Sequence, residues 1–279
     1  MTRNRIDPVN RVDLPVERVR PELSYVRLTD DPATGGWTRL LIRPAGHVNS
    51  RDQPHRLEYH TAQEEIVVLE GSVTFGDYYR ATALAYLNHP PFWLHPAEQR
   101  FDPLVDTVML IRLSKPIDTT YLPIPDGWDG REFFAKESDE PRGVAISALQ
   151  LDEVRFGPLL RDGEASGDEA GVLWHNPADG VVTWLWRIPR GWRGAGDPWQ
   201  AAGASDELYV LAGDLTTVYD GRTVRLTAGS YYCAPDEFSD GGREAHSEGG
   251  LLAVRWSSPV SRLTLPEVGH RRQAYPPVP

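Results

Sequence analysis

Two stretches of this sequence, 142 residues apart, read alike: residues 64–71 are EEIVVLEG and residues 206–213 are DELYVLAG. Chance accounts for one similar pair but not for several landmarks in one order at one spacing, so the sequence predicts a duplicated domain. The further pairs, 143 to 145 residues apart, are Pro44 and Gly46 with Pro189 and Gly191, Pro91 with Pro235, and residues 111–114 (IRLS) with residues 254–257 (VRWS).

Proline and glycine are too frequent for long helices. The 279 residues include 24 Pro and 25 Gly, and the longest stretch without either spans residues 55–70. An interior Pro costs a helix about 3 kcal/mol and an interior Gly about 1 kcal/mol relative to Ala. The runs between them are short and alternate or are rich in β-branched residues, which is typical of a small barrel or jelly roll. We therefore expect an all-β fold with little helix.

The repeat and the composition together predict two lobes joined by a linker. The segment between the repeats is rich in Pro and charge, with residues 131–140 as its one candidate for a short helix. The expected organisation is an N-terminal arm (1–20), a first lobe (21–115), a linker (116–145), a second lobe (146–262) and a C-terminal tail (263–279).

Charge and cysteine content restrict the partners. The chain has 29 Lys and Arg against 40 Asp and Glu, and this net charge of −11 excludes a phosphate-tracking surface for nucleic acid. Its apolar windows are too short for a membrane span. The single cysteine, Cys233, cannot form a disulfide within the chain, which fits a reducing compartment. We expect a cytoplasmic protein with a small-molecule substrate, and a homodimer is left open.

The histidines point to chemistry in the first lobe, where five of the eight lie, at positions 47, 55, 60, 89 and 95. His60-x3-Glu64-x6-Gly71, followed by Pro90 and five residues later by His95, resembles the cupin superfamily, whose motifs are HxHx3Ex6G and a Gly/Pro-rich strand that ends in His. The resemblance implies tandem jelly-roll (double-stranded β-helix) barrels, a bicupin, with the metal motif in the first lobe only.

The resemblance also implies a ligand set of His60, Glu64 and His95. Residues 58, 60 and 64 share one parity and so face one side of a strand, while His95 comes from a second strand. Two imidazoles and one carboxylate suit Fe(II), with Mn, Ni, Co or Zn as alternatives. We therefore expect one divalent transition metal in the first lobe.

The departures from the cupin motifs bear on residue roles. Glu58 replaces the first His and is assigned a catalytic role as a general base, with a fourth ligand or an outward residue as alternatives. The predicted substrate contacts are His55, His89 and Arg112. Alternatively, the two histidines lie just outside the ligand shell and support the metal ligands. Trp93 and Tyr59 are assigned to packing, on the side opposite the ligands. Leu84 and Phe92 replace two glycines, and Gln99 stands where Asn is common.

The second copy lacks the ligand set. Carrying the first-copy positions across gives Gln200, Ala202, Asp206 and Ser239, a poor site for a transition metal, so we expect this lobe to be degenerate. Trp184 and Trp186 are expected to fill its interior instead.

Three functions remain open. The first is a dioxygenase-like, Fe(II)-type oxygenase acting on a small organic molecule, favoured because two His and one carboxylate is its commonest ligand set. The second is a non-redox metal-dependent isomerase, cyclase or lyase. The third is a non-catalytic small-molecule binding or sensor protein.

Overall fold

The computed structural model describes residues 4–49, 56–126, 128, 145–161, 163–176, 180–195, 206–219, 221–234, 244–257 and 263–266. Within these ranges the chain forms β-strands and two short 3-10 turns, so the all-β prediction is confirmed. In the same ranges, no helix has the length and apolar character that a membrane crossing requires. The predicted helix at residues 131–140 lies outside the described residues.

The chain divides into two compact units. The N-terminal lobe comprises Val16–Leu28 and Thr34–Glu153. Its strands are β2 (Val16–Arg20), β3 (Leu23–Asp30), β4 (Trp37–Arg43), β5 (Val48–Asn49), β6 (Arg56–His60), β7 (Glu64–Glu70), β8 (Ser72–Phe75), β9 (Tyr79–Thr82), β10 (Ala85–His89), β11 (His95–Pro96), β12 (Gln99–Phe101), β13 (Thr107–Leu113), β14 (Thr119–Pro123) and β15 (Ile146–Gln150), with the 3-10 turn η2 (Leu151–Glu153).

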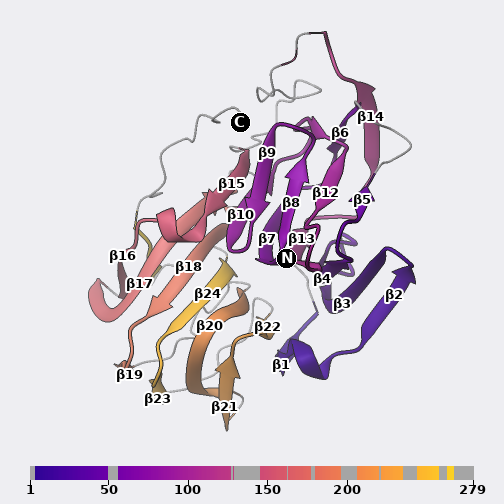
Figure 1. The fold of residues 1–279 in the computed structure, drawn as a ribbon. Helices are drawn as coiled ribbons and strands as arrows, with labels where there is room; N and C mark the ends of the chain where they lie inside the picture. The colour runs from indigo at the N-terminus through magenta and orange to yellow at the C-terminus, as the bar shows by residue number, and fades with distance from the viewer. Residues whose placement is uncertain are drawn as a thin grey trace. The chain divides into compact units, whose positions relative to one another are not determined.

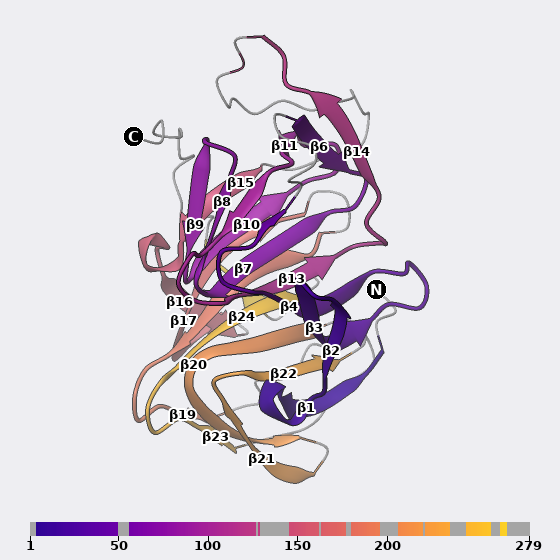
Figure 2. The same ribbon diagram turned by 45° about the vertical axis from the view of Figure 1, so that its right-hand side comes forward.

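Three antiparallel sheets enclose the interior of the N-terminal lobe. Their strand orders are β15-β10-β7-β13-β4-β3-β2, β11-β6-β14 and β5-β12-β8-β9. Figures 1 and 2 both show β6 beside β14. Residues of alternate parity from these sheets, among them Val68, Phe75 and Ile111, form one buried apolar cluster. This cluster joins the first and third of these sheets, while Leu57 and Tyr59 of β6 form a smaller apolar cluster with Leu94.

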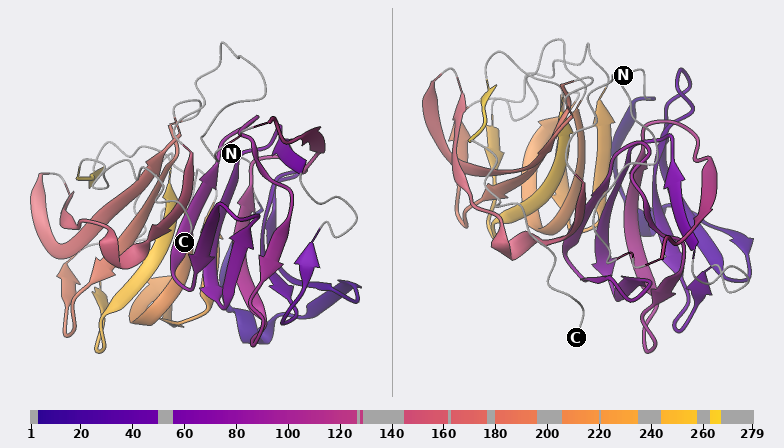
Figure 3. Two further views of the ribbon diagram at one scale, coloured as in Figure 1. Left: turned by 45° about the horizontal axis from the view of Figure 1, so that its top comes forward. Right: turned by 90° about the horizontal axis from the view of Figure 1, so that it is seen from above.

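The C-terminal lobe comprises the described residues of Met1–Pro15, Thr29–Ala33 and Val154–His270. Its main sheet has the order β1-β22-β20-β24-β18-β17-β16-β25, and its strands can be followed in both views of Figure 3. Its elements are β1 (Ile6–Asn10), η1 (Arg11–Asp13), β16 (Gly157–Arg161), β17 (Glu164–His175), β18 (Val182–Ile188), β19 (Arg193–Ala195), β20 (Asp206–Tyr219), β21 (Arg222–Thr227), β22 (Ser230–Ala234), β23 (Glu244–His246), β24 (Leu251–Ser257) and β25 (Leu263–Thr264).

Five strands fall differently from the expected segments. β2, in the expected arm, pairs with β3, and β14, in the expected linker, pairs with β6. β1, in the expected arm, pairs with β22, where Ile6 lies opposite Cys233. β15, at the expected start of the second lobe, pairs with β10 of the first. β25, in the expected tail, pairs with β16. Segments without a strong periodicity of their own thus extend sheets formed by other parts of the chain, and Cys233 is buried in such a sheet.

Positive backbone φ angles mark the turns around the repeated strand. Gly71 ends β7 with φ 73°, and a Cβ there would lie 2.8 Å from the Thr107 hydroxyl oxygen, so glycine is required on both counts. Among the described non-glycine residues, positive φ occurs at Leu84 (61°) and Phe92 (65°). These are the two positions at which this sequence replaces cupin-motif glycines, so the turns keep their geometry although the residues changed.

Candidate metal centre

Two cross-strand pairs of carboxyl and imidazole side chains meet inside the N-terminal lobe. His95 of β11 lies opposite Glu58 of β6, and His89 of β10 lies opposite Glu64 of β7. His60 follows Glu58 by two residues on β6 and shares its face. The His95 ring centroid is 5.3 Å from that of His60 and 4.6 Å from that of His89, so His95 lies within reach of both pairs. All five side chains are buried.

The loop before β14 fixes the orientation of His60. Its Nδ1 lies 3.1 Å from the backbone carbonyl oxygen of Asp118, and a carbonyl can only accept, so Nδ1 carries the proton. The Asp118 carboxylate in turn accepts from the backbone N–H and hydroxyl of Thr61, at 2.9 and 2.8 Å, and these bonds lower the pKa of Asp118. Nε2 of His60 is thereby left as a lone-pair donor.

His89 and His95 also have their Nδ1 atoms occupied. Nδ1 of His89 is 3.0 Å from Oε2 of Glu64, and Nδ1 of His95 is 3.3 Å from the carbonyl oxygen of Pro96. Nε2 of each ring is buried without a hydrogen-bond partner. Burial, followed by the nearby His89 and His60, holds the pKa of His95 well below its ordinary value, so this imidazole is neutral. Unpaired polar atoms in a buried site are costly, by about 1–3 kcal/mol each.

The two carboxyl groups differ in their protonation. Burial and the charge of Glu64 raise the pKa of Glu58 to about 8, although Gln99 opposes this by donating to its Oε1 at 3.4 Å. Burial likewise raises the pKa of Glu64, but the hydrogen bond and charge of His89 and the charge of His60 outweigh it and leave that pKa lowered. Without a cation, Glu58 therefore holds a proton and Glu64 is ionised at neutral pH.

The cluster fits a metal ion in its chemistry and in its unpaired atoms. Two sets of three ligand atoms lie within 4.8 Å of one another, Glu58–His60–His95 and Glu64–His89–His95. Imidazole nitrogen with carboxylate oxygen suits divalent transition metals, and a cation would satisfy the unpaired Nε2 atoms. The ligands implied by the resemblance are thus distributed over both sets, with His95 common to the two.

Aromatic side chains surround the paired imidazoles. Phe75 meets the rings of His89 and His95 edge-on, at 5.7 and 6.0 Å, and Trp93 lies at 4.6 and 5.4 Å from the same rings. Trp93, expected on the packing side, lies instead beside the imidazoles; it precedes His95 by two residues, so alternation along the chain itself puts both side chains on one face. The Trp93 indole N–H is buried without a partner, so it is a donor available at the centre.

Comparisons with known proteins bear on the fold. No family model and no curated protein sequence matches the chain. A solved structure of a proposed dioxygenase from Nostoc punctiforme matches with a TM-score of 0.66 at 17% identity, over 96% of this chain and 87% of that chain. A salicylate 1,2-dioxygenase from Pseudoaminobacter salicylatoxidans, an adduct with gentisate, matches with a TM-score of 0.58 at 14% identity, over 90% and 80%. An oxalate decarboxylase of Bacillus subtilis matches with a TM-score of 0.50 at 13% identity, over 91% and 76%.

The chain has the cupin fold. The resemblance read from the motifs is confirmed at this level, although the identities are too low to carry an activity across. Both of the three-ligand sets found among the described residues lie in the N-terminal cupin lobe. Of the second-copy counterparts, Gln200, Ala202 and Ser239 lie outside the described residues.

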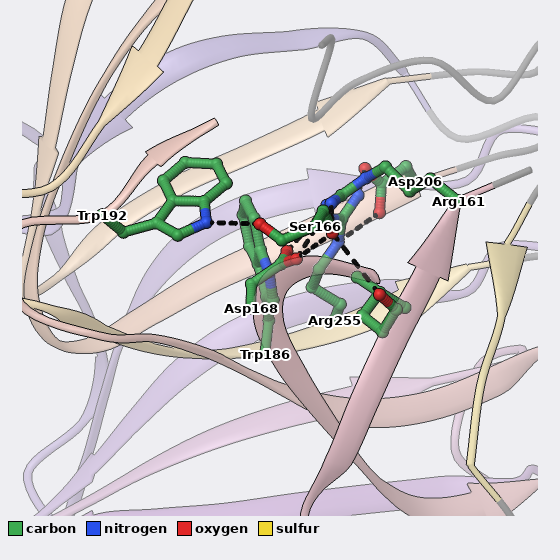
Figure 4. Close-up of polar contacts among 8 residues, drawn as sticks. Arg161, Ser166, Asp168, Trp186, Trp192, Asp206 and Arg255 are labelled. Carbon is green, nitrogen blue, oxygen red and sulfur yellow. Dashed lines mark hydrogen bonds and ion pairs between the residues drawn. The ribbon is translucent and has the colours of Figure 1, made fainter. Parts of the chain in front are cut away.

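In the C-terminal cupin lobe a guanidinium occupies the interior. Asp206 accepts from Nε of Arg255 at 3.1 Å, and a second Arg255 nitrogen contacts its other oxygen (Figure 4). The Tyr232 hydroxyl donates to that second oxygen as well. The Arg255 guanidinium carbon lies 4.9 Å from the ring centroids of both Trp184 and Trp186. Both indoles belong to the buried core, which confirms the packing role predicted for them.

A second ion pair adjoins this one. Arg161 binds Asp168 at 2.9 and 2.7 Å, and the Trp186 indole N–H donates to Asp168 at 2.6 Å (Figure 4). Ser166 also contacts Asp168, and its carbonyl accepts from Trp192 at 2.8 Å. The charges of this lobe are therefore compensated from within the chain.

Two of the predicted substrate contacts are not brought to the cluster by the described residues. Arg112 is buried, but its guanidinium pairs with Glu65 at 3.1 Å, and Tyr86 donates to the same carboxylate at 2.7 Å. Glu65 follows Glu64 on β7 and points to the opposite face. Arg112 is therefore a partner for Glu65 rather than an anchor at the metal centre. His55 lies outside the described residues.

Proposed function

We propose that this protein is a metal-dependent enzyme, an oxygenase that acts on a small organic molecule in the N-terminal cupin lobe. The observation that carries the proposal is the buried cluster in which the Nε2 atoms of His89 and His95 have no partner beside two carboxyl groups. The fold shared with a salicylate 1,2-dioxygenase supports it. Fe(II) is the metal that a mixed imidazole and carboxylate set suits best for oxygen chemistry.

The chain's own residues would prepare such a centre. His60, His95 and the carboxylates would hold the metal, which when bound supplies adjacent open positions for substrate and O2 and the electrons that pass between them. Asp118 and Thr61 keep His60 in the tautomer that presents Nε2. Phe75 and Trp93 exclude water from the paired imidazoles, which strengthens electrostatic interactions in the site.

Metal analysis of the purified protein, with O2 uptake, tests this function. We expect one divalent transition metal per chain, and O2 consumption that depends on an added small organic substrate. The double variant His60→Ala/His95→Ala is expected to lose both, since it removes two imidazoles of the cluster. An unchanged metal content in that variant would show that the metal does not bind at this cluster. A metal-loaded protein that turns over its substrate without consuming O2 would exclude the oxygenase activity.

A second candidate is a non-redox lyase or isomerase. It is favoured by Glu58, whose pKa of about 8 allows the carboxyl group to gain or lose a proton near neutral pH. The fold shared with an oxalate decarboxylase supports this candidate too. Substrate turnover at an undiminished rate in the absence of O2 would decide for it and against the oxygenase.

A further inference from the structure

We propose that His89 is a metal ligand through its Nε2 atom and that Glu64 acts through His89, as the group that orients the imidazole. The assignment rests on the metal centre of the proposed function and replaces Glu64 by His89 as a direct ligand. The cupin motif implies Glu64 as a direct ligand and has no counterpart to His89.

Register and hydrogen bonding place His89 between Glu64 and the centre. His89 and Glu64 are opposite residues of β10 and β7, and Nδ1 of His89 lies 3.0 Å from Oε2 of Glu64. An ionised carboxylate can only accept, so Nδ1 carries a proton and Nε2 is the nitrogen that can give its lone pair to a metal. A carboxylate that binds the far nitrogen of a metal-ligating imidazole is the usual arrangement outside a ligand shell, where it fixes tautomer and ring orientation.

The neighbouring imidazole, His95, also has a buried Nε2 atom without a hydrogen-bond partner. Nδ1 of His95 points at the Pro96 carbonyl, so Nε2 of His95 is also an unprotonated nitrogen. The two rings stack with their centroids 4.6 Å apart, and both Nε2 atoms are buried without a partner. Two lone pairs cannot hydrogen-bond to each other, whereas one cation satisfies both.

The surrounding side chains restrict other solutions. Phe75 lies against the edges of both rings and Trp93 covers them at 4.6 and 5.4 Å, so neither imidazole can turn to solvent without displacing an aromatic side chain. Trp93 offers a donor N–H and no acceptor, so it can approach an imidazole lone pair but cannot ligate a metal. The set Glu64–His89–His95 therefore presents two imidazole nitrogens, one of them outside the cupin motif.

Metal affinity separates this assignment from the one in which Glu64 is the ligand and His89 only supports it. Zn²⁺ binding is measured by competition with a chromophoric chelator for the full-length protein, His89→Ala, Glu64→Gln and His95→Ala. In Glu64→Gln the amide oxygen still accepts from His89 Nδ1 but the negative charge is lost. The Zn²⁺ affinity of this variant is therefore expected to fall only by about 10–100-fold, the loss typical of a group that supports a ligand. His89→Ala is expected to fall further than this and to match His95→Ala. His47→Ala, at a histidine outside both ligand sets, serves as the control and is expected to keep the wild-type affinity.

A spectroscopic count of ligands provides a second readout that does not depend on catalysis. Pulsed electron paramagnetic resonance of the Cu²⁺-loaded protein detects the remote nitrogens of bound imidazoles. His89→Ala is expected to bind Cu²⁺ at high concentration with one imidazole fewer, and Glu64→Gln with the wild-type number. Near-ultraviolet circular dichroism checks that each variant is folded.

The outcomes are distinguishable. Three results would overturn the assignment while the metal centre stands. The first is a Zn²⁺ affinity of His89→Ala within tenfold of the wild-type value, and the second is an unchanged number of bound imidazoles in that variant. The third is a Zn²⁺ affinity of Glu64→Gln as low as that of His95→Ala. A wild-type protein that takes up neither metal would overturn this assignment together with the proposed function.

Discussion

The two cupin lobes place an acidic residue at the same point of the repeat and compensate it differently. Glu64 lies opposite His89 and Leu113, and Asp206 lies opposite Ala234 and Ser257 in the equivalent strands. Around Glu64 the described partners are imidazoles, two of which have unpaired Nε2 atoms. Around Asp206 the partner is the guanidinium of a buried arginine. The N-terminal lobe thus presents unpaired nitrogen atoms in a set of groups that suits a metal ion, and the C-terminal lobe contains its own cationic partner.

A shift of one residue in strand register accounts for much of this contrast. The similar segments 111–114 and 254–257 align Arg112 with Arg255. In the structure, however, Arg112 lies opposite Glu65 and Arg255 lies opposite Leu208, so their side chains take opposite faces. A register shift in β13 near Val108 and another in β20 near Val210 accompany the difference. Because side chains alternate along a strand, one residue is enough to move an arginine from one face of the sheet to the interior.

The largest expected effect comes from breaking the internal ion pair. Asp206→Ala leaves the Arg255 guanidinium buried without its carboxylate, and removal of one partner from a buried pair costs about 3–5 kcal/mol. Glu64→Ala in the metal-free protein leaves the Nδ1–H of His89 without its acceptor, and one unsatisfied buried donor costs about 1–3 kcal/mol. Urea unfolding of both variants measures the two losses. Equal losses would contradict the view that the C-terminal lobe carries its charge balance within the chain and the N-terminal lobe does not.

The sequence was sufficient to predict the repeat and the histidine-rich interior of the first lobe. It was not sufficient to predict on which face of a strand each side chain lies. Gly71 and Gly213 occupy the same position of the repeat, between β7 and β8 in one lobe and within β20 in the other, and both have positive φ, so the repeat extends to the backbone. Trp93, expected on the side opposite the ligands, lies on the face of His95, two residues further along the chain. The pairing of His89 with Glu64 depends on register between strands, which no single-strand periodicity encodes.

A smaller effect is expected at the carboxyl group that lacks a cation. In the metal-free protein the pKa of Glu58 is raised from 4.5 to about 8. Between these values the unfolded chain has released the proton and the folded chain has kept it, so stability is lost as pH rises through the interval and is flat above it. The slope of stability against pH over this interval is at most about 1.4 kcal/mol per pH unit, the free energy that corresponds to one pKa unit.

Glu58→Gln should abolish this part of the pH dependence because an amide does not titrate. Chemical unfolding of the metal-free wild type and the variant across the interval measures it. Added metal is expected to flatten the wild-type curve in the same way, since a bound cation favours the ionised carboxylate. A wild-type protein whose stability rises with pH relative to the variant would show that Glu58 already has a cationic partner within the chain.

The smallest expected effect concerns the turn that precedes β10 and its equivalent before β22. Leu84 donates its backbone N–H to the Val68 carbonyl at 2.7 Å, and Gly229 donates to the Val210 carbonyl at 2.9 Å at the equivalent point of the other lobe. Both have positive φ, 61° and 86°, but only Leu84 has a side chain that makes this conformation unfavourable. Leu84→Gly is expected to stabilise the N-terminal lobe by about 1 kcal/mol, since a left-handed non-glycine residue costs about 1–2 kcal/mol and glycine adds flexibility to the unfolded chain. Leu84→Ala keeps the Cβ atom and is the matched control, expected to show no gain. Because the Leu84 side chain is exposed, its removal creates no cavity, and equal stability changes in the two variants would mean that the difference between the lobes at this turn lies in side-chain packing and not in the backbone.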